Sequence, residues 1–147
     1  MNRKIEFRGK CSHCDAWAYG NLVNYDDDEA PEIHGFDPYR EGDEVWREIT
    51  VAPDTVGQFT GLKDKNGKEI YEGDILRSPL GNIVSVEFGY KEHIVKHGRP
   101  QITDGFACYG WIARNVKNGI TDFFDNEFAA GEVIGNIHDN QDLLNKK

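Results

Sequence analysis

A chain of 147 residues has the length of one domain, or of a larger and a smaller lobe. It carries 26 Asp and Glu against 17 Lys and Arg, and the net charge of −9 disfavours broad binding to nucleic-acid phosphates. No apolar run is long enough to cross a membrane, and the Cys count of 3 is odd, so membrane and disulfide-scaffold classes are excluded and a cytoplasmic location is expected.

Short strands are expected in the N-terminal part of the chain, because apolar side chains alternate with period two in the first two of them, whereas the third is a short extended piece and the fourth is less regular. The expected strands lie at residues 5–7, 17–19, 33–36 and 45–51. A long acidic connection over residues 26–44 encloses the third of them. We therefore predict a small N-terminal β lobe over residues 1–52.

Glycine and proline divide residues 53–147 into segments that are too short for helices of normal length. Asn66-Gly67 predicts a tight turn, and a short helical turn is expected at 141–144. Residues 123–130 fit either a helical turn or an extended crossing. Further strands are expected at 56–62, 70–76, 83–88, 106–112 and 131–137. Short strands between turns are typical of a small barrel.

The C-S-H-C run at residues 11–14 is the nearest approach to a metal motif, because two thiolates at this spacing can reach one zinc ion. A structural zinc needs four ligands, and the remaining thiol, Cys108, reads as a small core residue. His34 is one residue that could come near in space. A redox motif would open a helix, whereas a strand is expected after Cys14. We therefore predict no metal site, name Cys11 and Cys14 as candidate ligands, and favour a turn with reduced thiols.

Other charged groups favour structural roles over chemistry. Glu72 and Asp74 flank Gly73 and could form an acid/base pair, but a bend is favoured there. The acidic run at 26–29 lacks the spacing of a calcium loop and indicates a solvated loop. A basic cluster also favours a solvated loop: Lys91, His93, Lys96, His97 and Arg99. Because the nucleophile, phosphate-loop and dinucleotide motifs are missing from the sequence, no catalytic or cofactor-binding residue is predicted.

Several sequence blocks, in order along most of the chain, resemble the YopX family. They are I-E-F-R-G-K at 5–10, W-A-Y-G at 17–20, T-V-G-Q-F-T-G-L-K-D at 55–64, N-G-K-E-I-Y-E-G-D-I-L at 66–76 and V-I-G-N-I-H-D-N at 133–140. Members are typically encoded by phages and prophages. The resemblance implies a mainly β fold with an SH3-like C-terminal barrel, and it implies no established activity. The cysteines at 11–14 replace the family's usual polar turn, and 89–105 looks like variable territory.

These observations predict a mainly β protein with few short helices, an N-terminal β lobe over 1–52 and an SH3-like barrel section over 53–147. We expect a phage-type accessory protein that binds another protein or its own copies, catalyses nothing and exposes aromatic side chains near Tyr71 and Trp111.

The alternative is a nucleic-acid-associated protein, either a single-strand binder or an acidic mimic of DNA. An enzyme that uses a metal at 26–29 or at the two cysteines is a third hypothesis. The aromatic candidates for a stacking face are Trp17, Tyr19, Trp46, Tyr71, Phe88, Tyr109 and Trp111.

Overall fold

The structure is a computed structural model that describes residues 4–26, 28–36 and 45–145. It is mainly β, as predicted, with two antiparallel sheets and, in these ranges, a single α-helix of 4 residues. The chain divides into two compact units. The N-terminal unit comprises Met1–Lys63 and Gly67–Gly73, and the C-terminal unit comprises Asp64–Asn66 and Asp74–Lys147.

The N-terminal unit is built on a six-stranded sheet in the order β4-β3-β2-β1-β5-β6. Its strands are β1 (Phe7–Lys10), β2 (Trp17–Val23), β3 (Glu32–Phe36), β4 (Trp46–Thr50), β5 (Gly57–Lys63) and β6 (Glu69–Tyr71), with the 3-10 turn η1 (Pro53–Thr55) before β5. The sequence predicted a strand that overlaps each of the first four, although the first was expected at 5–7 and shares only Phe7 with β1. Apolar side chains that point inward form the core of this unit, among them Ile33, Val51, Phe59 and Ile70.

The units divide the chain later than the predicted boundary between residues 52 and 53. The reason is strand pairing: Phe7 and Arg8 of β1 pair with Gln58 and Gly57 of β5. Strands β5 and β6 therefore complete the N-terminal sheet, although they follow the proline that opens the predicted second section.

The C-terminal unit holds a five-stranded antiparallel sheet in the order β10-β9-β8-β7-β11. Its elements are β7 (Asp74–Arg77), β8 (Ile83–His97), β9 (Ile102–Asn115), β10 (Thr121–Phe123), α1 (Asn126–Ala129), β11 (Glu132–Asn136) and the 3-10 turn η2 (Gln141–Asn145). Among the described residues the outer strands of each sheet do not pair with each other, so both sheets are open. The SH3-like barrel stays a prediction.

Local signals in the sequence explain the turns of the C-terminal half. Gly67 and Gly73 have φ values of +80° and +90°, which confirms the predicted turn and bend. Residues 123–130, for which a helical turn and an extended crossing were both open, contain both structures, because β10 ends in this segment and α1 follows it. Asp125 begins that helix, since its side chain accepts hydrogen bonds from the backbone N–H groups of Glu127 and Phe128.

The core of the C-terminal unit lies where β7, β8 and β9 pair. The side chains buried there are Ile75, Leu76, Val84, Val86, Ile112 and Ala113. Within the described part of the chain, helices are too short or too polar to cross a bilayer.

Candidate interaction surface

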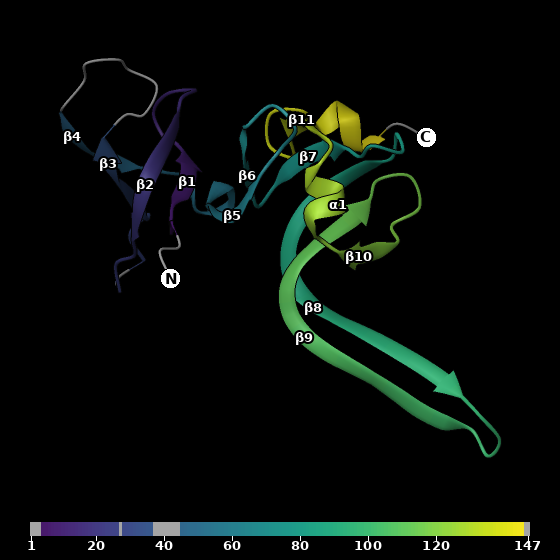
Figure 1. Cartoon of the computed structure of the whole chain (residues 1–147). Helices are drawn as coiled ribbons and strands as arrows, with labels where there is room; N and C mark the ends of the chain where they lie inside the picture. Colours follow the sequence, from purple (N-terminus) through teal and green to yellow (C-terminus); the bar gives the residue numbers. More distant parts are fainter. Residues whose placement is uncertain (1–3, 27, 37–44, 146–147) are drawn as a thin grey trace. The chain divides into compact units, whose positions relative to one another are not determined.

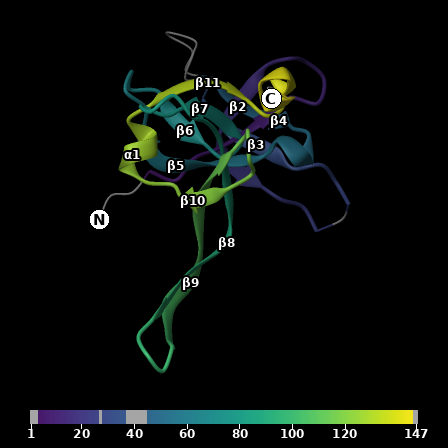
Figure 2. The same ribbon diagram turned by 90° about the vertical axis from the view of Figure 1, so that its right-hand side faces the viewer.

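A long hairpin formed by β8 and β9 dominates the C-terminal unit. Its antiparallel register continues without a break from the base of the hairpin to its tip. Within β8, only residues 83–85 pair with β7. Within β9, only residues 112–114 pair with β10. Residues 88–111 therefore extend beyond the sheet as two strands, which we call the ribbon (Figures 1 and 2).

The ribbon contains the basic cluster for which a solvated loop was predicted, and that prediction is wrong. Lys91, Lys96 and His97 lie in β8, and Arg99 lies in the turn that joins β8 to β9. The side chain of His93 lies outside the described part of the structure. Charged residues are compatible with a strand here, because both faces of a two-stranded ribbon can meet water.

One face of the ribbon carries a row of large apolar side chains, interrupted on β8 by Glu92, which we call the aromatic face. Phe88, Tyr90 and Ile94 alternate along β8, and Tyr109 and Trp111 lie opposite them on β9. The ring centroids of Phe88 and Trp111 are 5.2 Å apart in an edge-to-face pair, and those of Tyr90 and Tyr109 are 5.5 Å apart. Such cross-strand aromatic pairs stabilise the ribbon.

The aromatic face is open to water. Phe88, Tyr90 and Tyr109 are 54%, 52% and 72% exposed, and Trp111 is half-buried. With about 200 Å² per aromatic residue, the three exposed residues leave on the order of 350 Å² of surface in water. That area is in the range of the largest apolar patches on monomeric proteins, which are often functional. Because an isolated two-stranded hairpin is only marginally stable in water, a partner on this face would stabilise the ribbon.

The opposite face of the ribbon contacts its own unit. The Lys91 ammonium lies 5.8 Å from the ring centroid of Phe123 and is 3.4 Å from the Thr121 hydroxyl oxygen, to which it donates. Phe106 stacks on Phe123 with centroids 5.5 Å apart. Cys108 is exposed, so the prediction that it is a core residue is wrong. Cys108 is exposed because, in the part of the chain that the structure describes, the stretch of β9 around it pairs only with β8.

Tyr71, which was predicted to be exposed, is buried in the N-terminal unit and only 2% exposed. Its hydroxyl donates to the Glu6 carboxylate at 2.6 Å and lies 3.0 Å from Glu69. Burial, followed by the hydrogen bond to Glu6 and the charges of both carboxylates, raises the pKa of Tyr71. The exposure prediction is therefore wrong for Tyr71, whereas Trp111 is half-buried on the aromatic face.

The two candidate zinc ligands, Cys11 and Cys14, lie in the connection between β1 and β2. The Cys14 thiol donates a hydrogen bond to Cys11, which lowers the pKa of Cys11. Both line a groove of about 400 Å³ whose walls come from β2, β3 and β4. His34 lies beside Glu32 and Glu48 instead of joining the cysteines. The predicted turn with reduced thiols and no metal stays a prediction.

The two acidic candidates, Glu72 and Asp74, do not line this groove. Glu72 lies in the turn after β6, in the N-terminal unit, whereas Asp74 begins β7 in the C-terminal unit and is 1% exposed. Burial raises the pKa of Glu72, and the nearby Arg8 opposes that shift.

The acidic run at 26–29 is an exposed loop where the structure describes it, as predicted. Asp27 lies outside the described residues. Asp28 has a φ of +30°, a backbone conformation that Asp tolerates better than most residues.

Sequence reasoning named Phe88, Tyr109 and Trp111 among the aromatic candidates and missed Tyr90 and Ile94. The signal was present, because both residues continue the period-two pattern of β8 beyond Gly89.

The sequence has no significant match among curated proteins. A family model described as YopX protein matches residues 6–145, which span both compact units and include the whole ribbon. The chain therefore belongs to the YopX family.

Proposed function

We propose that this chain is a non-enzymatic phage or prophage accessory protein that self-associates through the aromatic face of its ribbon. The observation that carries this proposal is the exposure of Phe88, Tyr90 and Tyr109 on a segment of only two strands. Aromatic residues are enriched in protein interfaces and at their energetic hot spots. Two such faces together supply on the order of 700 Å² of surface, most of the roughly 1,000 Å² that is the lower limit for a specific interface.

A second copy of the chain suits this face because its chemistry is self-complementary. In a two-fold interface, the same patch meets itself on the partner. Glu92 and Lys96 follow the aromatic residues on the same face of β8 and carry opposite charges. A two-fold axis that sets the aromatic residues of one copy against those of the other leaves these charged residues at the edge of the contact, where charges favour specificity more than affinity.

The finer parts of the proposal have separate support. The resemblance to phage-encoded family members supports a phage or prophage origin. The odd number of Cys residues supports action in a reducing bacterial cytoplasm. Five antiparallel strands with a bend at Gly73 support an SH3-like arrangement of the C-terminal unit.

Excision of the ribbon tests the proposal directly. Gly89 and Gly110 face each other in the register, so deletion of residues 90–109 leaves them as a two-residue Gly-Gly hairpin turn. We expect the wild type to form dimers in sedimentation velocity and the shortened chain to remain monomeric, with the circular-dichroism signal of β structure in both. A wild type that is monomeric at every concentration tested would overturn self-association.

Point variants localise the contact. Tyr109→Ser should weaken self-association by about 30-fold, the effect of losing a hot-spot side chain worth about 2 kcal/mol. Leu80→Ser is the matched control, because Leu80 is 91% exposed but lies in the turn between β7 and β8, outside the ribbon. Equal effects of the two variants would show that general surface hydrophobicity, and not the aromatic face, drives association.

A nucleic-acid function is the second candidate, because Lys96 and Arg99 lie on the same ribbon as the exposed aromatic side chains. Aromatic stacking combined with basic groups is how many proteins bind single strands. A labelled single-stranded oligonucleotide should then bind with an affinity that falls steeply with salt, and Lys96→Gln should reduce the salt slope by about 0.7. Such binding by a monomeric wild type would favour this candidate over self-association.

A further inference from the structure

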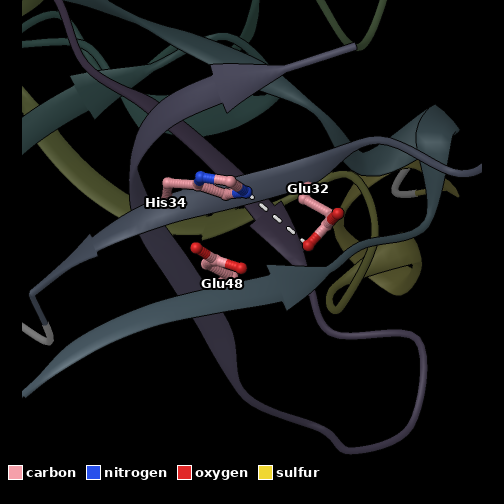
Figure 3. Close-up of side chains that lie close together, drawn as sticks. All are labelled: Glu32, His34 and Glu48. Carbon is pink, nitrogen blue, oxygen red and sulfur yellow. Dashed lines mark ion pairs between the residues drawn. The ribbon is translucent and has the colours of Figure 1, made fainter. Parts of the chain in front are cut away.

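Three potential metal ligands meet on one face of the N-terminal sheet, away from the ribbon. Glu32 and His34 are two residues apart on β3 and therefore point to the same side. Glu48 of β4 pairs directly with His34. The ligand atoms of all three side chains lie within 4.8 Å of one another. Figure 3 shows the three side chains gathered between β3 and β4.

The imidazole of His34 is the central group of this cluster. Its Nε2 atom is 3.6 Å from the Glu32 carboxylate, the contact marked in Figure 3. Nε2 is shielded from water and has no hydrogen-bond partner among the described residues. A buried nitrogen without a partner is costly, so its orientation toward two carboxylates needs a physical reason. A bound cation would supply that reason.

The Glu32 carboxylate is held by a neighbour. The Tyr25 hydroxyl donates to one of its oxygens, while the other oxygen faces His34. Hydrogen bonds of this kind orient ligating carboxylates in metal sites.

We propose that Glu32, His34 and Glu48 bind one divalent transition-metal ion, of which zinc is the reference case. One imidazole favours such an ion over magnesium or calcium, and two carboxylates balance its charge. In tetrahedral zinc sites with bonds of about 2.0–2.2 Å, neighbouring ligand atoms are roughly 3.4 Å apart. The His34–Glu32 separation of 3.6 Å is already close to that value, and the exposed Glu48 can close the remaining gap by rotating its side chain.

The ion would join β3 to β4, so its binding stabilises the N-terminal unit by mass action. This role does not depend on self-association, and the two proposals therefore fail separately. With three protein ligands, water would complete the coordination shell.

Titration of the full-length chain with cobalt(II) and with zinc tests the site. The background is a variant with Cys11→Ser and Cys14→Ser, because the thiol pair would compete for either ion. We expect one ion per chain, a cobalt spectrum without sulfur-to-metal charge transfer, and a rise in the midpoint of thermal unfolding on adding zinc. In this background Glu48→Gln should weaken binding at least about tenfold.

Two variants control for charge and folding. Asp54→Asn removes another exposed carboxylate of the same unit and should leave the affinity unchanged. Glu48 is exposed, so its variant should keep the wild-type circular-dichroism spectrum. The proposal is overturned if the double-serine background binds neither ion, if Glu48→Gln binds as tightly as the background, or if Asp54→Asn weakens binding equally.

Discussion

The two units place the same type of residue in opposite environments. In the N-terminal unit, Tyr71 is buried and packs against Tyr19 and Phe59 at centroid distances of 5.4 and 5.6 Å. The Arg8 guanidinium lies over the Tyr71 ring at 5.1 Å and over the Trp17 ring at 4.7 Å. These aromatic residues hold the sheet together.

In the C-terminal unit, Tyr109 also belongs to a strand and pairs with another tyrosine, yet it is 72% exposed. The difference comes from the neighbours of each strand. Strand β6 belongs to a six-stranded sheet whose core covers Tyr71, whereas this part of β9 pairs only with β8. A high aromatic content therefore stabilises the fold in one unit and provides a contact surface in the other.

The largest expected effect compares these two tyrosines. Tyr71→Ala should lower the free energy of unfolding by about 3–5 kcal/mol, because it leaves a cavity and removes a buried hydrogen bond. Tyr109→Ala should lower it by at most about 1 kcal/mol, because it removes one exposed cross-strand aromatic pair. Urea unfolding at a concentration where the chain is monomeric measures both. Similar losses in the free energy of unfolding for the two variants would contradict the different roles of Tyr71 and Tyr109.

A smaller effect is expected for the cation that lies between the rings. Arg8 is 4% exposed, and one of its guanidinium nitrogens donates to the Glu72 carbonyl oxygen at 3.3 Å. Arg8→Lys keeps the charge but loses the planar group that stacks on two rings, so we expect a loss of about 1–2 kcal/mol. Arg114→Lys is the matched control, because Arg114 pairs with Glu87 at an exposed position and should lose at most about 0.5 kcal/mol.

Much of the fold could be predicted from local patterns. Apolar residues located strands that overlap β1 to β4, and Asn66-Gly67 and Gly73 located a turn and a bend, because these features depend on a few neighbouring residues. The extension of β8 from Phe88 to His97 was missed, since Gly89 and the charged residues after it resemble the end of a strand. Toward the tip of the ribbon, where residues 96–100 are exposed, charged side chains carry little desolvation cost.

The candidate sites were less predictable, because they depend on contacts that are distant in the sequence. Whether Tyr90 is buried is decided by whether a third strand covers it, which no local pattern shows. The spacing of Glu32 and His34 places them on one face once β3 is recognised. Glu48 joins them only through the β3–β4 register, which follows from pairing across the intervening residues.

The smallest expected effect concerns the carboxyl group beside the buried aromatic cluster. Burial raises the pKa of Glu72, although a hydrogen bond from the Gln58 backbone and the charge of Arg8 oppose the shift. The folded state therefore holds the Glu72 proton more tightly than the unfolded state does. Its stabilising contribution is complete below about pH 4 and is lost as the pH rises through the folded-state pKa.

Glu72→Gln stays uncharged and should thus raise the free energy of unfolding at neutral pH by a few tenths of a kcal/mol, a small value because Glu72 is only half-buried. At about pH 4 the variant and the wild type should be equally stable.

Glu69→Gln should have the opposite effect on the free energy of unfolding. Burial alone would raise the pKa of Glu69, but hydrogen bonds from Lys4 and Tyr71 lower it, so this variant should lose stability at neutral pH. Urea unfolding at the two pH values measures both variants. If both change the free energy of unfolding at neutral pH in the same direction, the opposite pKa shifts of Glu72 and Glu69 are contradicted.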